Sequence, residues 1–285
     1  MGTTWSARIV DPPAGARDAI EAVLGRVVDQ MSNWEAASDI SRLNAAPIGR
    51  WVDQPADCLT VLRAGLDVAR ASDGAFDPAI GRLVARWGFG PGAAGGAPSA
   101  PWRAIEMEDG RARRVADVAL DLSGIAKGFA VDAAAAALRM IGADSFLMEI
   151  GGELLGRGIK PDLQPWWVDV EAPDGMAVPV LRIALCGMAV ATSGDYRRYR
   201  MEGDRRLSHS IDPASGAPIA NQVASVTVIH DSAMLADAWA TAITVLGHDR
   251  GMRLATRHGL AARLVRREGA RDQEYMTPAL AAMLE

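Results

Sequence analysis

The chain has 285 residues, of which 49% are hydrophobic and 23% charged, and these values fit a globular protein and exclude a disordered or fibrous one. Its net charge of -5 argues against a general nucleic-acid surface, which needs a positive field to release counterions from phosphates. The length allows one large domain or two closely joined ones.

The first half of the chain is predicted to alternate between amphipathic helices and short strands. Residues 32–44 are interpreted as a polar turn, and the Gly/Pro/Ala-rich residues 88–101 as a flexible surface loop. The apolar spacing and capping residues predict helices over residues 16–31, 57–74, 76–87 and 125–141. The alternating segments predict strands over residues 1–10, 103–107, 111–115 and 118–122.

The second half is predicted to consist mainly of strands. One helix is expected over residues 233–246, with Ser232 as its N-cap and Gly247 as its end. Alternation predicts strands over residues 145–150, 166–170, 180–185, 188–191, 196–201, 206–211 and 222–229. Runs of strands with a few separate helices favour an α+β fold with mixed or antiparallel sheets and packed helices. We expect residues 1–285 to form a single domain.

Neither a membrane span nor a secretory signal is predicted. No stretch of about 18 uninterrupted apolar residues occurs, and the first residues lack a basic start and an apolar stretch. We therefore expect a cytoplasmic protein as the sequence stands, or a periplasmic one if a leader has been removed.

Asp237 and Thr241 form the first candidate for chemistry. They are four residues apart, so a helix places both side chains on one face. Both carry hard oxygen atoms, which Mg²⁺ prefers. The alternative is an exposed aspartate and a threonine bonded to its own helix.

Residues 121–128 form the second candidate, a strand that runs into a helix through small residues. Amides at a helix N-terminus favour phosphate oxygens, and Lys127 adds a positive charge. The spacing is not that of a Walker loop. The alternative is a capped helix with Lys127 on the surface.

Further segments carry side chains that could act in catalysis or bind a ligand. His209 lies on a predicted strand that leads into an Asp-Pro turn, where it is either a catalytic base or a structural residue. Residues 34–44 and 75–90 carry Trp34, Phe76 and Asp77, and aromatic side chains of this kind stack well on a flavin or adenine ring. Residues 191–196 form either a plain turn or a phosphate-facing loop.

Taken together and in this order, these motifs resemble the FAD:protein FMN transferases of the ApbE family. The resemblance spans nearly the whole chain. It is carried by residues 1–5, 38–44, 74–90, 121–132, 149–152, 192–196, 209–216 and 236–247.

The resemblance implies a T-fold-related protein in two intimately joined halves, which binds FAD with Mg²⁺ in the cleft between them. It implies that the carbonyl of Gly124, the side chains of Asp237 and Thr241 and the backbone of Ala240 bind the metal. His209 matches the catalytic histidine of the family. The positions that match FAD contacts are Met1, Trp34, Ala75, Phe76, Asp77, Asp121, Lys127 and Ile211.

The implied reaction moves the FMN half of FAD to a threonine hydroxyl of an acceptor protein and releases AMP. Acceptors in the family include subunits of membrane redox complexes. Mg²⁺ and Lys127 would neutralise phosphate charge, and His209 would deprotonate the hydroxyl. The alternatives are hydrolysis of FAD to FMN and AMP, and a non-catalytic FAD carrier. Intact Asp237, Thr241 and His209 argue against the carrier, which needs neither a metal nor a base.

Overall fold

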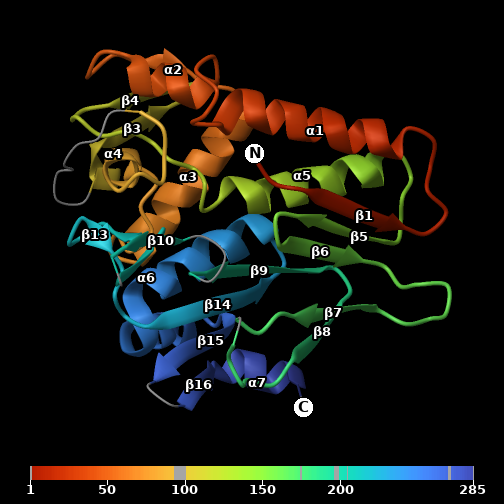
Figure 1. The fold of residues 1–285 in the computed structure, drawn as a ribbon. Helices are drawn as coiled ribbons and strands as arrows, with labels where there is room; N and C mark the ends of the chain where they lie inside the picture. The colour runs from red at the N-terminus through yellow and green to blue at the C-terminus, as the bar shows by residue number, and fades with distance from the viewer. Residues whose placement is uncertain are drawn as a thin grey trace.

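A seven-stranded antiparallel sheet lies at the centre of the computed structural model, which describes residues 2–92, 101–173, 175–195, 199–203, 205–268 and 271–284 (Figure 1). The strand order is β1-β5-β6-β9-β14-β15-β16, and each neighbouring pair is antiparallel. The strands are β1 (Trp5–Ile9), β5 (Phe146–Ile150), β6 (Glu153–Arg157), β9 (Met188–Gly194), β14 (Val223–His230), β15 (Ala261–Glu268) and β16 (Arg271–Met276). The predicted α+β fold is confirmed.

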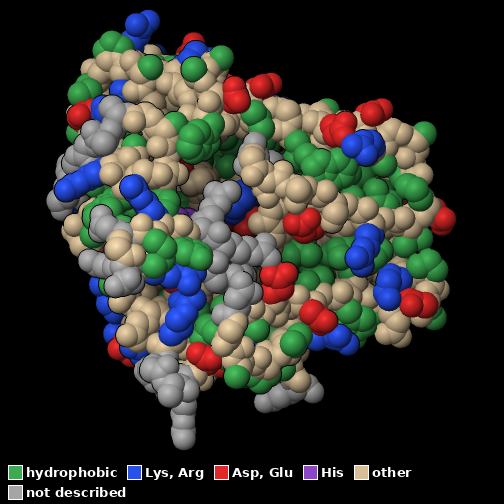
Figure 2. All heavy atoms as spheres, in the orientation of Figure 1, with side chains coloured by type: hydrophobic (Ala, Val, Ile, Leu, Met, Phe, Trp, Pro, Cys, Tyr) green, Lys and Arg blue, Asp and Glu red, His purple; other side chains and the backbone are tan. Residues whose placement is uncertain are grey.

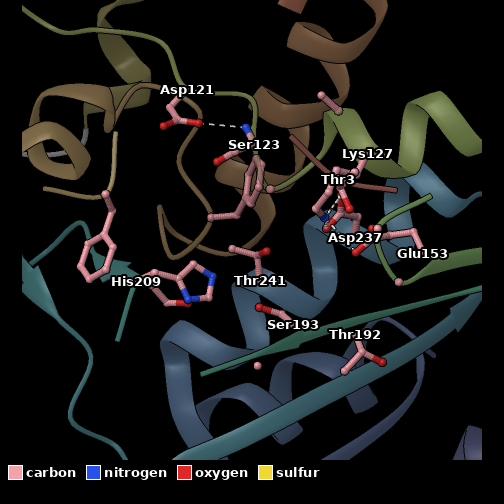
Figure 3. A pocket seen from close by; sticks show the side chains of 18 of the residues that line it. Thr3, Asp121, Ser123, Lys127, Glu153, Thr192, Ser193, His209, Asp237 and Thr241 are labelled. Atoms are coloured by element: carbon pink, nitrogen blue, oxygen red, sulfur yellow. Dashed lines mark hydrogen bonds and ion pairs between the residues drawn. The ribbon is translucent and has the colours of Figure 1, made fainter. Parts of the chain in front are cut away.

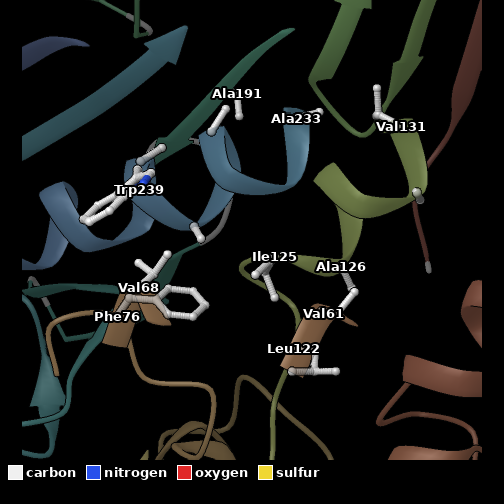
Figure 4. Close-up of a cluster of buried hydrophobic side chains, with 14 of the residues drawn as sticks. Val61, Val68, Phe76, Leu122, Ile125, Ala126, Val131, Ala191, Ala233 and Trp239 are labelled. Atoms are coloured by element: carbon white, nitrogen blue, oxygen red, sulfur yellow. The ribbon is translucent and has the colours of Figure 1, made fainter. Parts of the chain in front are cut away.

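Helices cover one face of this sheet and enclose the main core. The helices are α1 (Ala16–Met31), α3 (Ala56–Ala71), α5 (Ala126–Met140) and α6 (Ala233–Arg257). Helix α5 packs on β5 and β6, and α6 packs on β9, β14 and β15. Ile20, Val23 and Val27 of α1 recur every three or four residues, so they form one buried face of that helix. Val68, Phe76 and the α6 residue Trp239 belong to this core, part of which is drawn in Figure 4.

A smaller apolar cluster covers the other face. It joins the hairpin of β7 (Trp166–Val170) and β8 (Leu181–Leu185) to α7 (Pro278–Leu284). Strand β14 contributes Val226 and Val228 to the main core and Ile229 to this cluster. Both faces of β14 are therefore covered, and seven of its eight residues are buried.

The remaining elements lie along the left side of the view in Figure 1. Strands β2, β4 and β3 form a small antiparallel sheet in that order, and two short hairpins follow later in the chain. These elements are α2 (Asp39–Ala45), β2 (Val52–Asp53), α4 (Gly81–Arg86), η1 (Pro101–Ala104), β3 (Ile105–Glu108), β4 (Arg111–Arg114), β10 (Tyr199–Glu202), β11 (Arg205–Ser208), β12 (Ile211–Asp212) and β13 (Ala217–Pro218).

Helices α5 and α6 are tied together at the start of α6. The carboxylate of Asp132 on α5 accepts hydrogen bonds from Ser232 Oγ (2.7 Å) and from the amides of Ala233 (2.8 Å) and Met234 (3.0 Å). Ser232 also caps α6 itself, because its hydroxyl accepts from the amide of Leu235. The predicted N-cap is confirmed, and the cap fixes where α6 begins relative to α5.

Several predicted elements match the structure closely, and others are corrected. The helix over residues 16–31 and the strand over residues 166–170 have the predicted bounds. The predicted polar turn contains α2 instead, because Ser38 Oγ accepts from the amide of Ser41 and begins a helix. The predicted strand over residues 118–122 forms only a single bridge, between Ala119 and Ile80.

Two helix boundaries are also corrected. Helix α4 begins at Gly81 rather than at residue 76, because Asp77 instead accepts a hydrogen bond from the amide of Ala79 in the preceding turn. Gly247 does not end α6 but bends it, with φ of 75°. The side-chain amide of Asn221 donates to the carbonyls of Thr244 and Val245, directly before the bend.

Strands β6, β15 and β16 and helix α7 were not predicted from the sequence. Residues 93–100 of the predicted surface loop and residues 196–198 of a predicted strand lie outside the described residues. Within the described part of the chain, none of the helices is both long and apolar enough to cross a membrane.

Candidate active site

A cavity of about 590 Å³ lies between the helical layer and the second half of the chain, and the molecular surface is hollowed near the centre of the face seen in Figure 2. It collects most of the predicted site residues from segments far apart in the sequence. The predicted residues that line it are Trp34, Ala75, Phe76, Asp77, Asp121, Gly124, Lys127, His209, Ile211, Asp237 and Thr241.

Two predicted residues are not placed at the cavity. Met1 lies outside the described residues. Ala240 is fully buried in α6, and its carbonyl accepts a hydrogen bond from Thr244 Oγ1 at 2.8 Å. The structure therefore brings Asp237 and Thr241 to the cavity but not Ala240.

Lys127, Glu153 and Asp237 form a close charged cluster on one side of the cavity (Figure 3). Lys127 Nζ lies 2.8 Å from Glu153 Oε1 and 3.2 Å from each carboxylate oxygen of Asp237. The amide of Gly128 also donates to Asp237 Oδ2, at 3.2 Å. Lys127 is thus an inward-facing partner of two carboxylates rather than a surface residue.

The two carboxylates of the cluster are buried, whereas Lys127 is partly exposed. The side chains of Asp237 and Glu153 are 6% and 2% exposed, so Asp237 does not lie on the exposed helix face that one reading of the sequence assumed. Burial alone would lower the pKa of Lys127, but the charges of Asp237 and Glu153 outweigh it and raise that pKa. Lys127 therefore carries a positive charge at neutral pH.

Gly124 and Thr241 lie close to each other at the cavity, which Asp237 also lines. A Cβ built on Gly124 would lie 3.2 Å from Thr241 Oγ1 and 3.3 Å from Phe76 Cε2, so glycine allows the loop and α6 to approach closely. Asp237 and Thr241 lie one turn apart on α6, as predicted. Among the described residues there is no group of three or more His, Cys, Asp or Glu side chains suited to a metal. A metal here would need the hydroxyl, the carbonyl and oxygen atoms from a ligand.

Asp121 shapes the start of α5. Its Oδ1 accepts a hydrogen bond from the amide of Ser123 at 2.9 Å, in the turn that carries Gly124. Asparagine and aspartate side chains commonly bond to the amide two residues on and so hold such turns. Asp121 therefore orients the loop that brings Gly124 and Lys127 to the cavity.

Asp77 is buried and holds its own loop together. Its Oδ1 accepts from the amide of Ala79 at 2.8 Å, and its Oδ2 accepts from the amide of Trp102 at 3.0 Å. Burial raises the pKa of Asp77 to about 7, although the two amide donors lower it in part. The neighbouring Ala75 and Phe76 are buried as well, whereas Trp34 at the cavity rim is 72% exposed.

His209 lies beyond Thr241 from the charged cluster, as Figure 3 shows. It follows β11, is half-buried, and meets Phe89 edge-on with ring centres 6.4 Å apart. The nearby carboxylates of Asp195 and Asp212, which could also serve as a base, are not among the described residues that line the cavity. Both carboxylate oxygens of Asp195 instead accept from Arg267 at 2.9 Å.

Sequence reasoning missed two parts of this cavity and misjudged the structure of a third. Glu153 was missed, although its position directly after the motif over residues 149–152 could have pointed to it. Thr192 and Ser193, in the segment predicted as a plain turn or a phosphate-facing loop, line the cavity from strand β9. Residues 168–171 of the β7 hairpin also line it, and their sequence carries no signal for this.

The cavity holds a large excess of carboxylates. Lys127 is the only lysine or arginine among the described residues that line it. The acidic residues that line it are Asp77, Asp121, Glu149, Glu153, Asp169, Glu171 and Asp237. A phosphate-bearing ligand would meet repulsion here unless a cation accompanied it.

Comparison with known proteins identifies the family of the chain. The ApbE family model matches residues 1–264. A FAD:protein FMN transferase of Vibrio cholerae is 34% identical over 296 residues, which cover 96% of this chain and 88% of the relative. One from Haemophilus influenzae is 32% identical and covers 99% of this chain and 88% of the relative.

Solved structures of ApbE proteins also match this chain. The apo crystal structure of the flavinyl transferase ApbE from Pseudomonas stutzeri matches with a TM-score of 0.90 and 37% identity, covering 99% of this chain and 94% of that one. The flavin transferase ApbE of Vibrio cholerae matches with a TM-score of 0.89 and 32% identity, covering 99% and 96%. The chain belongs to the ApbE family.

Proposed function

We propose that this protein transfers the FMN half of FAD to a threonine hydroxyl of an acceptor flavoprotein, with Mg²⁺ bound and AMP released. The observation that carries the proposal is the single cavity that unites His209, Lys127, Asp237 and Thr241 with the aromatic Phe76. The names of the relatives, FAD:protein FMN transferase, support the same reaction. We further propose that residues 1–285 act as one domain.

The residues present fit a magnesium ion. Asp237, Thr241 and the carbonyl of Gly124 offer three hard oxygen atoms of the kind that Mg²⁺ binds, and FAD phosphate and water would supply the others. The excess of carboxylates in the cavity also supports a bound cation, which would offset their negative charge. When bound, the ion would neutralise negative charge on the pyrophosphate as AMP leaves. Ala240 is left out of this set, because its carbonyl faces Thr244.

Lys127 and the loop before α5 would hold the phosphates. The ammonium group of Lys127 enters the cavity beside the proposed metal ligand Asp237. Asp121 fixes the turn that leads into α5, so that the start of the helix faces the same space. Ala75, Phe76, Asp77 and Ile211 would contact the remainder of FAD, as the family resemblance implies.

His209 would act as the general base. Its imidazole takes the proton from the threonine hydroxyl while the hydroxyl oxygen forms a bond to the phosphorus on the FMN side of FAD. The bond from that phosphorus to the bridging oxygen breaks, and AMP leaves with the electron pair. Histidine suits this role because the reference pKa of its imidazole, about 6.5, lies close to neutral pH.

The test mixes the protein with FAD, Mg²⁺ and threonine-containing fragments of candidate acceptor flavoproteins. We expect mass spectrometry to find an acceptor that gains FMN and a matching amount of AMP, and EDTA to stop both. Free FMN without a modified acceptor would indicate hydrolysis instead. Binding of FAD without either product would indicate a carrier, and absence of FAD binding would refute the proposal.

A further inference from the structure

Glu153 has no role in the reaction as written above, although it makes the closest contact in the charged cluster. Its Oε1 lies 2.8 Å from Lys127 Nζ, nearer than either oxygen of Asp237 at 3.2 Å. Its side chain is 2% exposed, and its Oε2 is buried without a hydrogen-bond partner among the described residues. A carboxylate buried with a single strong partner carries a free-energy cost that a neutral side chain would avoid.

The position of Lys127 creates a competition at Asp237. The ammonium group reaches both carboxylate oxygens of Asp237, which are the atoms that a divalent cation would bind. A cation at Asp237 would repel an ammonium group that depends on the same oxygens. Lys127 therefore needs a second anionic partner if Asp237 is to bind a metal while the lysine stays in the cavity.

We propose that Glu153 is a positioning residue, which holds Lys127 beside the phosphates and so leaves Asp237 available to the divalent cation. This inference rests on the proposed function, because it assumes a cation at Asp237. Without the charge of Glu153, Lys127 would pair with Asp237 alone, and the cation would have to displace it.

The test titrates Mg²⁺ into the full-length protein in the presence of FAD and follows both the melting temperature and the rate of FMN transfer. For Glu153→Gln we expect the half-saturating Mg²⁺ concentration to rise about tenfold or more, as for other partners that orient metal ligands. The rate at saturating Mg²⁺ should fall much less than this. Glu153→Asp should lie between Glu153→Gln and the parent.

Glu149→Gln is the matched control. Glu149 also lines the cavity, but it accepts from the amide of Gly152 at 2.9 Å and makes no contact with Lys127 among the described residues. Its loss removes the same charge without releasing the lysine, so we expect a change in half-saturating Mg²⁺ of less than about threefold. Equal shifts in Glu149→Gln and Glu153→Gln would show a general charge effect and overturn the proposal.

A double-mutant cycle keeps the test decisive even if Glu153→Gln is unstable. In a Lys127→Met background no ammonium group competes for Asp237, so adding Glu153→Gln should leave the half-saturating Mg²⁺ concentration unchanged. A shift as large as in the parent background would overturn the proposal. A parent protein whose melting temperature and activity ignore Mg²⁺ would refute the proposed function and this inference with it. If the parent responds to Mg²⁺ and Glu153→Gln has the same half-saturating Mg²⁺ concentration, the role of Glu153 is refuted while the proposed function stands.

Discussion

Gly128 lies so close to Ala233 that a Cβ built on the glycine would be 2.1 Å from the carbonyl oxygen of Ala233. Helices α5 and α6 therefore meet backbone to backbone at this point. The same contact lets the amide of Gly128 reach Asp237, and it places Lys127 against that carboxylate. The geometry of the charged cluster depends on the absence of one methyl group.

Gly128→Ala should separate the two helices and weaken both folding and metal binding. We expect a loss of unfolding free energy of about 1–3 kcal/mol, the usual cost of overpacking a tight core contact. Urea unfolding and the Mg²⁺ dependence of transfer would measure the two effects. The control is Gly25→Ala in α1, where a Cβ meets nothing within 4 Å, so this variant should gain about 0.5–1 kcal/mol. A stable Gly128→Ala variant with normal Mg²⁺ dependence would contradict the prediction.

Asp237→Ala should abolish Mg²⁺-dependent transfer. The fold should persist, because Lys127 keeps Glu153 as a partner, although the buried amide of Gly128 loses an acceptor at a cost of about 1–3 kcal/mol. Transfer assays over a range of Mg²⁺ concentrations, with urea unfolding beside them, would separate these effects. Full activity in this variant would remove Asp237 from the site.

His209→Ala and His209→Asn should still bind FAD and Mg²⁺ but transfer FMN about 10²–10⁴-fold more slowly, the usual contribution of a positioned general base. His209 lies across Thr241 from the Lys127 cluster, so its loss should leave that cluster in place (Figure 3). Higher pH should restore part of the rate, because the acceptor hydroxyl ionises more readily. Parent rates in both variants across pH 6–9, around the reference pKa of histidine, would make His209 structural.

Asp77 should make the fold less stable as pH rises. Burial raises its folded-state pKa to about 7 from a reference value of 3.8, so the protonated carboxyl is favoured in the folded protein. Its contribution is complete below about pH 4 and is lost as pH rises to about 7, by at most about 1.4 kcal/mol per pH unit. Unfolding free energies measured from pH 4 to 8 should show this slope in the parent and a smaller slope in Asp77→Asn. Identical slopes would place the ionised form in the folded protein.

The sequence predicts best where a pattern is local. Helix α1 has its predicted bounds because Ile20, Val23 and Val27 repeat with the helical period. Asp237 and Thr241 were paired correctly for the same reason, since four residues make one helical turn. The region around Asp77 was placed at the site, but its helix was predicted too early, because the bond from Asp77 to Ala79 is a turn that a periodic pattern does not reveal.

Non-local contacts explain what the sequence could not predict. Lys127 and Glu153 meet because α5 packs across β6, and nothing in their spacing of 26 residues indicates a pair. Strand β15 was missed because its arginines conceal the apolar alternation, and one of them, Arg263, is buried against Glu274. The bend at Gly247 depends on Asn221, which lies far earlier in the chain.

The imbalance of charge in the cavity ties the two proposed ligands to each other. Seven carboxylate-bearing residues and one lysine line the space in which FAD would place its pyrophosphate. A cation that relieves this repulsion raises the affinity for FAD, and thermodynamic reciprocity requires FAD to raise the affinity for the cation by the same factor. When AMP leaves, the pyrophosphate is lost, and the coupling between the two affinities is lost with it. Once AMP has left, the same carboxylates would repel the phosphate group that remains on FMN, so FMN would be bound more weakly than FAD.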